Sequence, residues 1–285
     1  MVQKAERVTA PQILGRNTGR PGRPVGNVTR GTTNPNRMRR VDRWLTGPQA
    51  WRLRNAADPL VVDLGYGAAP ATAVELYERL SAVRRDVRVF GIEIEPERVR
   101  AAIPLERPGL SFRVGGFELP VPGQPVLVRA FNVLRQYEEA DVAGIWRLVQ
   151  DRLAPGGLFI DGTCDEIGRR VTWVALDAER PLFLSISVRF GSFVLPSDVA
   201  ERLPKALIHR NVPGEPVHAL LQAMDRAWLE CAPLASFGNR QRWQGMCRSL
   251  RDTGWPVQDG PSRWRLGELT VDWDAVAPLA GGGAG

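Results

Sequence analysis

The sequence has few of the residues that build metal centres and disulfide scaffolds. It contains three cysteines and two histidines in 285 residues, and no CxxC pair occurs. An odd, scattered set of cysteines argues against a disulfide framework and is typical of a reducing cytosol, and five separated ligand candidates do not predict a zinc site. No apolar run approaches the ~18 residues that a membrane span needs, and the opening residues lack the apolar segment of a secretory signal. We therefore expect a cytoplasmic protein without a metal or a membrane anchor.

Lysine is also scarce, and the positive charge is unevenly distributed. Lys4 and Lys205 are the only lysines. Residues 1–43 hold ten basic and two acidic residues, a charge of +8, whereas the whole chain carries +7, so that residues 44–285 carry −1. Residues 15–37 contain mainly Gly, Pro, Arg, Asn and Thr, and such a stretch buries too little apolar surface to offset chain entropy. We expect residues 1–43 to form a basic, flexible arm.

Three roles are open for this arm. It is either a solubilising tail or a segment that binds the phosphates of RNA or DNA, because clustered arginines release counterions from a polyanion. The third role is that residues 34–43 fold back as a lid over a ligand site. If the arm binds nucleic acid, the arginines expected to contact it are Arg20, Arg23, Arg37, Arg39 and Arg40.

From residue 44 onward, short apolar strands alternate with amphipathic helices. Strands are expected over residues 60–64, 87–92, 110–114, 125–133 and 158–161, with helices between them. This alternation predicts a mostly parallel sheet covered on both faces, which is the doubly wound α/β class. After this α/β part we expect two further strands over residues 171–176 and 182–190 and helices within residues 217–253. A last strand over residues 268–273 and a flexible tail at 281–285 follow.

A glycine turn directly follows the first of these strands. Asp63 lies near the end of the strand, and Gly65-Tyr66-Gly67 leaves bare backbone where a ligand can approach closely. Glu93 ends the next strand, where a carboxylate can accept hydrogen bonds from both hydroxyls of a ribose. A dinucleotide fingerprint needs glycine at the sixth position of the turn, but this chain has Pro70 there. These residues favour a nucleoside ligand that has no pyrophosphate.

The segment resembles the class I S-adenosylmethionine-dependent methyltransferases over about residues 60–163. Residues 63–70 are similar to the family's first motif, acid-x-Gly-x-Gly, and Glu93 matches the acid that holds the ribose. One departure concerns adenine: Gly116 replaces the aspartate that usually bonds the adenine amine. Adenine recognition is therefore left to backbone groups or to Glu118.

The resemblance implies a seven-stranded, Rossmann-like sheet with an antiparallel final strand, S-adenosylmethionine as the cofactor, and methyl transfer to an N or O acceptor. It assigns to the cofactor Asp63, Gly65, Tyr66, Gly67, Glu93, Ile94, Gly116, Phe117 and Asn132. No general base can be named, and the candidates for catalysis are Asn132, Tyr137 and His209. Asn132 is equally compatible with a ligand contact and with backbone bonding at a strand end. Tyr137 is equally compatible with a substrate contact and with core packing.

Two questions stay open at this level. The first is the methyl acceptor: the basic arm favours RNA or DNA, whereas the near-neutral charge of residues 44–285 favours a small molecule or a protein. The altered adenine position is also compatible with a non-catalytic S-adenosylmethionine-binding module. The second question concerns the C-terminal strands: residues 171–190 either supply the last hairpin of the sheet or belong to an insertion. We prefer an insertion that contains residues 171–190, with residues 268–273 closing the sheet, so that residues 171–235 form a substrate-side elaboration of the domain at 44–285.

Overall fold

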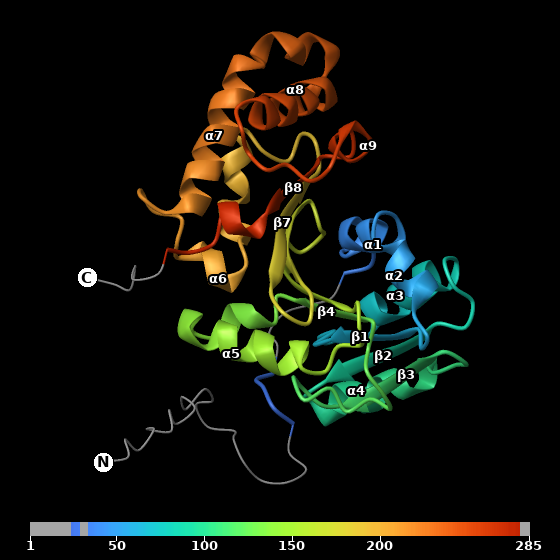
Figure 1. The fold of residues 1–285 in the computed structure, drawn as a ribbon. Helices are drawn as coiled ribbons and strands as arrows, with labels where there is room; N and C mark the ends of the chain where they lie inside the picture. Colours follow the sequence, from blue (N-terminus) through green and yellow to red (C-terminus); the bar gives the residue numbers. More distant parts are fainter. Residues whose placement is uncertain (1–23, 29–33, 280–285) are drawn as a thin grey trace, which may run out of the picture.

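Eight strands form one sheet in the computed structural model, which describes residues 24–28 and 34–279 (Figure 1). The strands are β1 (Leu60–Leu64), β2 (Arg88–Glu93), β3 (Leu110–Val114), β4 (Leu127–Phe131), β5 (Leu158–Cys164), β6 (Arg170–Leu176), β7 (Pro181–Val188) and β8 (Glu268–Asp272). They lie in the order β3-β2-β1-β4-β5-β6-β7-β8.

The first five strands form the parallel half of the sheet. β1 pairs in parallel with β2 on one side and with β4 on the other, and β3 and β5 extend the two sides. Every residue of β1, β4 and β5 is buried, as expected for strands covered on both faces. β2 and β3 are added on one side of β1, and β4 and β5 on the other, so the order of the strands reverses between β1 and β4. Ligands of doubly wound sheets bind at the carboxyl ends of the strands beside such a switch point.

Helices cover both faces of the sheet. They are α1 (Arg39–Thr46), α2 (Ala50–Asn55), α3 (Ala71–Ser81), α4 (Pro96–Ala102), α5 (Glu139–Gln150), α6 (Lys205–Ile208), α7 (Pro216–Glu230), α8 (Asn239–Asp252) and α9 (Pro261–Trp264). One apolar core contains residues of α1–α4, and a second contains residues of α5, α7 and α8. The doubly wound α/β class predicted from the strand and helix pattern is confirmed.

The antiparallel half of the sheet differs from our expectation. A short turn after Cys164 folds β6 back onto β5, and β7 and β8 follow in antiparallel pairing. The sheet does end at β8, as preferred, but residues 171–188 are sheet strands and not an insertion, which gives eight strands in place of seven. The reason is that β6 is apolar at nearly every position and is buried on both faces. The helices α6–α8 form the added layer, and Trp243 of α8 donates to the Glu268 carbonyl oxygen of β8.

The N-terminal segment belongs to the fold from residue 34 onward. The boundary expected at residue 43 falls inside α1, whose Val41, Trp44 and Leu45 are buried in the core. Arg40 is buried and donates to the carbonyl oxygens of Gly168 and Leu266, and burial lowers the pKa of Arg40 to about 10.

Arg37 also binds the protein, since its Nε donates to the Asp165 carbonyl oxygen at 3.0 Å. The structure therefore corrects the assignment of Arg37 and Arg40 to a phosphate-binding arm, because protein acceptors hold both guanidinium groups. Arg39 is exposed, whereas Arg20, Arg23 and the tail at 281–285 lie outside the described residues.

Within the described part of the chain, no helix combines the length and the apolar character that crossing a membrane requires. The same residues contain no group of three or more His, Cys, Asp or Glu side chains arranged to hold a metal ion.

Candidate functional site

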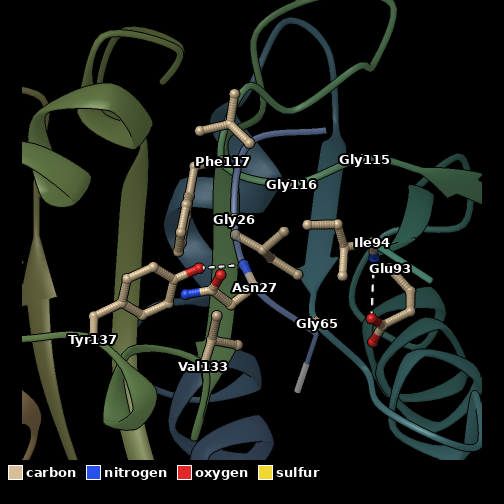
Figure 2. A pocket seen from close by; sticks show the side chains of 12 residues that line it. Gly26, Asn27, Gly65, Glu93, Ile94, Gly115, Gly116, Phe117, Val133 and Tyr137 are labelled. Atoms are coloured by element: carbon tan, nitrogen blue, oxygen red, sulfur yellow. Dashed lines mark hydrogen bonds between the residues drawn. The ribbon is translucent and has the colours of Figure 1, made fainter. Parts of the chain in front are cut away.

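A pocket with a cavity volume of about 20 Å³ lies at the carboxyl ends of β1 and β2, beside the switch point (Figure 2). Its walls come from the ends of β1 and β2, the loops after β3 and β4, and the N-terminal segment. The lining residues are Val25, Gly26, Asn27, Leu64, Gly65, Glu93, Ile94, Gly115, Gly116, Phe117, Val133 and Tyr137. Of the residues assigned to the cofactor from sequence, the pocket thus gathers Gly65, Glu93, Ile94, Gly116 and Phe117.

Glu93 joins the end of β2 to the glycine turn. Its Oε2 accepts from the backbone N–H of Gly67 at 2.9 Å, and its Oε1 accepts from that of Ile94 at 3.0 Å. The turn needs glycine, because Gly65 and Gly67 have φ of 69° and 84°, in the left-handed region that other residues rarely adopt. The N–H of Gly65 also donates to the Ile92 carbonyl oxygen at 2.7 Å. Turn and carboxylate are therefore held together as one wall of the pocket.

Asp63 lies behind this wall and does not line the pocket. Its Oδ1 accepts from Nε of Arg129 at 2.9 Å, and its Oδ2 accepts from the Thr72 hydroxyl at 2.9 Å. Arg129 also pairs with Asp42 of α1, which in turn pairs with Arg79 of α3.

Burial sets the pKa values in this network. It raises the pKa of Asp42 against the opposing charges of Arg129 and Arg79. Burial also lowers the pKa of Arg129, but the carboxylates of Asp42 and Asp63 outweigh that effect and raise it overall. Arg129 faces both buried carboxylates, whereas Arg79 is shared between Asp42 and Glu75. Asp63 thus holds β1, β4 and α3 together and, through Arg129, also α1. A cofactor contact by Asp63 stays a prediction.

Two further residues of the sequence-based set lie beside the pocket and do not line it. The ring of Tyr66 packs edge-on against Phe112, with ring centroids 5.5 Å apart. Asn132 has a left-handed backbone, φ 59°, and its Oδ1 accepts from the backbone N–H of Cys164 at 3.1 Å. Asn132 therefore ties the end of β4 to the end of β5.

Of the other catalytic candidates, Tyr137 lines the pocket and His209 does not. The Tyr137 ring stands edge-on to Phe117, and burial raises the pKa of its hydroxyl to about 12. His209 is exposed at the end of α6, where its Nε2 lies 3.1 Å from Nζ of Lys205. Of the three catalytic candidates, only Tyr137 therefore lines the pocket.

The N-terminal residues 24–28, here called the strap, form the wall that sequence reasoning missed. Figure 2 shows the strap passing between Phe117 and Tyr137 on one side and Ile94 and Glu93 on the other. The Val25 carbonyl oxygen accepts from the Phe117 N–H at 2.9 Å, and the Val25 N–H donates to Glu118 Oε2 at 2.8 Å. The sequence signal was limited to two valines, Val25 and Val28, in a stretch of Gly, Pro and polar residues. The lid considered as a third role for residues 34–43 is not seen at this pocket: residues 25–27 line it, and residues 34–43 do not.

A wider cavity of about 260 Å³ lies elsewhere on the molecule, between the α1–α2 connection and the β7–β8 part of the sheet. Its lining residues are Trp44, Pro48, Gln49, Phe183, Gln258, Asp259, Arg263 and Thr270. It contains neither the glycine turn nor the strand-end acid. The smaller pocket is therefore the candidate site, on the basis of its chemistry and not of its size.

The strand order β3-β2-β1-β4-β5, the glycine turn after β1 and the acid that ends β2 together define a class I methyltransferase-like fold. No known family model matches the chain. No curated protein is significantly similar to it in sequence.

Solved structures with similar regions include three methyltransferases. One is the putative methyltransferase in a complex with the Haloferax volcanii Trm112 methyltransferase activator (24% identity, 43% of this chain, 59% of that chain, TM-score 0.31). Another is magnesium protoporphyrin IX methyltransferase from Synechocystis with bound SAH (16%, 48%, 63%, TM-score 0.33). Human N-acetylserotonin methyltransferase in complex with SAM is the third (23%, 46%, 39%, TM-score 0.30). Each match covers less than half of this chain and less than two thirds of the neighbour.

Proposed function

We propose that this chain is a methyltransferase that binds S-adenosylmethionine in the pocket at the ends of β1 and β2. The observation that carries the proposal is the pairing of Glu93 with the glycine turn: the carboxylate accepts from the Gly67 N–H at 2.9 Å and lines the pocket. A carboxylate at the end of the second strand, next to a bare glycine turn, is suited to ribose hydroxyls.

The lining residues fit the parts of this cofactor. Glu93 would hold the ribose, the backbone at Gly65 would face the methionine portion, and Ile94 would lie beside the adenine. The Phe117 N–H and the Glu118 carboxylate offer one donor and one acceptor next to each other, and the adenine edge presents the complementary pair, an amino donor beside a ring-nitrogen acceptor. These two groups would take the place of the aspartate that Gly116 replaces.

Methyl transfer from this cofactor requires mainly that the protein position the reactants. The bound cofactor supplies a sulfonium methyl group, which an acceptor lone pair attacks as the carbon–sulfur bond breaks. The protein then has to hold acceptor and methyl group in line in a dry site. Tyr137 is the side chain placed to contact an acceptor, and with a pKa raised to about 12 it acts as a neutral hydrogen-bonding group and not as a base near pH 7. We infer an N or O acceptor whose lone pair is already available.

The cofactor proposal is tested by calorimetric titration of S-adenosylhomocysteine into wild type, Glu93→Gln and Glu97→Gln. Glu97 is the matched control, because its side chain is exposed and pairs only with Arg100 in the ion pairs described. Loss of a hydrogen bond to a charged group costs roughly 1.5–3 kcal/mol, so Glu93→Gln should weaken binding at least about tenfold and Glu97→Gln should not. Equal measurable affinities for all three proteins would reject the proposal.

The acceptor class needs a separate experiment, transfer of labelled methyl into fractionated cell extract. The nucleic-acid hypothesis now concerns Arg20, Arg23 and Arg39, because Arg37 and Arg40 bind protein groups. Label in the nucleic-acid fraction that is lost in the triple Arg→Gln variant supports an RNA or DNA acceptor. Label in proteins or small molecules that is retained in the variant supports the alternative. Binding of S-adenosylhomocysteine without label in any fraction would make the chain a non-catalytic binding module.

A further inference from the structure

The strap occupies the part of the pocket that the cofactor's adenine would enter. Hydrogen bonds to its backbone hold it there. The Val25 carbonyl oxygen accepts from the Phe117 N–H at 2.9 Å, and the Val25 N–H donates to Glu118 Oε2 at 2.8 Å. The Asn27 N–H donates to the Tyr137 hydroxyl at 2.5 Å, and the Asn27 carbonyl oxygen accepts from Gln136 Nε2 at 3.3 Å. The two residues of each pair, Val25 with Glu118 and Asn27 with Tyr137, are 93 and 110 positions apart in the sequence. The strap is therefore held by distant residues of the pocket.

The Val25 backbone has the same hydrogen-bonding pattern as an adenine edge. It offers an N–H to the Glu118 carboxylate and a carbonyl oxygen to the Phe117 N–H. The adenine edge likewise offers an amino donor beside a ring-nitrogen acceptor. The strap and an adenine ring would therefore use the same donor and the same acceptor, and each excludes the other.

Two glycines are needed for the strap to lie in this position. A Cβ on Gly116 would lie 1.9 Å from the Val25 carbonyl oxygen, a distance that no side chain can occupy. Gly26 has φ of 144°, and a Cβ there would lie 3.1 Å from the Tyr137 hydroxyl oxygen. Gly116 stands at the position where the resemblance predicts aspartate, so the strap gives a physical reason for that departure: an aspartate would clash with Val25.

The size of the pocket agrees with this account. With the strap in place the cavity volume of the pocket is about 20 Å³, whereas sites for small molecules and cofactors usually measure about 300–1,000 Å³. The strap thus leaves less room than a whole nucleoside with an amino-acid tail requires.

We propose that the strap is an autoinhibitory pseudo-ligand, which must leave the adenine site before S-adenosylmethionine can bind. The proposal rests on the function proposed above, because it concerns the same pocket. A site that is open only part of the time binds its ligand with an apparent affinity reduced by the open fraction. Weakening the strap, with every pocket residue outside the strap unchanged, should therefore tighten cofactor binding.

The test is the affinity of S-adenosylhomocysteine for the full chain carrying Val25→Pro or Val25→Ala. Proline removes the N–H that Glu118 accepts, whereas alanine keeps both backbone groups and shortens the side chain to the same or a greater extent. Val25→Pro should bind about tenfold more tightly than Val25→Ala, a difference of about 1.4 kcal/mol. If wild type binds and Val25→Pro binds no more tightly than Val25→Ala, the strap inference fails while the cofactor proposal stands. If no protein binds, the cofactor proposal fails and the strap inference fails with it.

Hydrogen exchange gives a second readout that does not depend on a variant. If the strap leaves when the cofactor enters, saturating S-adenosylhomocysteine should speed amide exchange in the wild-type peptide that contains Val25 and Asn27. Exchange that is slower or unchanged with ligand would show that the strap stays in place or closes over the cofactor, and would overturn the proposal.

Discussion

Replacing Arg129 by methionine should destabilise the protein strongly, although the new side chain has a similar length. Arg129 is 1% exposed and lies between two buried carboxylates, those of Asp42 and Asp63. Its Nη2 also donates to the Thr72 carbonyl oxygen at 3.0 Å. Methionine can fill the space but can satisfy none of these groups.

The magnitude follows from the charges left behind. In wild type Arg129 and Arg79 oppose the buried carboxylates of Asp42 and Asp63, and Arg79 also pairs with Glu75 at the edge of the network. The variant loses the positive charge that faces both buried carboxylates. Removing one partner of a buried ion pair typically costs about 3–5 kcal/mol. We expect Arg129→Met to lower the free energy of unfolding by this amount near pH 7.5.

The loss should depend on pH in a defined direction. Burial already raises the pKa of Asp42, and the positive charge of Arg129 opposes that rise. Without Arg129 the folded-state pKa of Asp42 should be higher still, so the folded variant binds a proton more readily than the unfolded chain and loses stability as the pH rises. The deficit relative to wild type should therefore be larger at pH 8 than at pH 5.5.

Urea unfolding followed by circular dichroism at both pH values measures this deficit, with Arg129→Met/Asp42→Asn as the control for charge balance. Asparagine removes the excess negative charge, so the double variant should be about 1–3 kcal/mol more stable than the sum of the two single changes predicts. A loss below about 1 kcal/mol for Arg129→Met, or additive losses at both pH values, would refute the reasoning.

Two further predictions concern a buried acid and the strap. Asp161 is buried, accepts from Trp146 Nε1 at 3.0 Å, and has a pKa raised by burial from 3.8 to about 7. The folded protein therefore holds this proton where the unfolded chain releases it, and the Asp161 contribution should fall by about 2–3 kcal/mol from pH 5 to pH 8. Urea unfolding should show that fall in wild type relative to Asp161→Asn; parallel curves would contradict it. Gly116→Ala should expel the strap, because its Cβ would lie 1.9 Å from the Val25 carbonyl oxygen. Faster amide exchange at residues 24–28 is expected, and unchanged exchange would count against the contact.

The sequence by itself determined the parallel half of the fold. The strands at 60–64 and 110–114 have the predicted bounds, and the glycine turn and Glu93 lie where the pattern places them. These features are local: an apolar strand, a turn that needs left-handed glycine and an acid at a strand end are each written in a few consecutive residues. Parallel pairing then brings the ends of neighbouring strands to one edge.

Only the tertiary structure decided which groups meet across the chain. Asp63 is bonded by Arg129, 66 positions away, and Glu118 by Val25, 93 positions away. No local sequence pattern predicts either partner. A buried carboxylate pairs with whichever opposite charge the packing brings close to it, and every residue except proline has the same backbone N–H. The β6–β7 strands likewise read as an insertion until their two-sided burial placed them in the sheet. Periodicity and turns specify elements, whereas the contents of the pocket follow from how those elements pack.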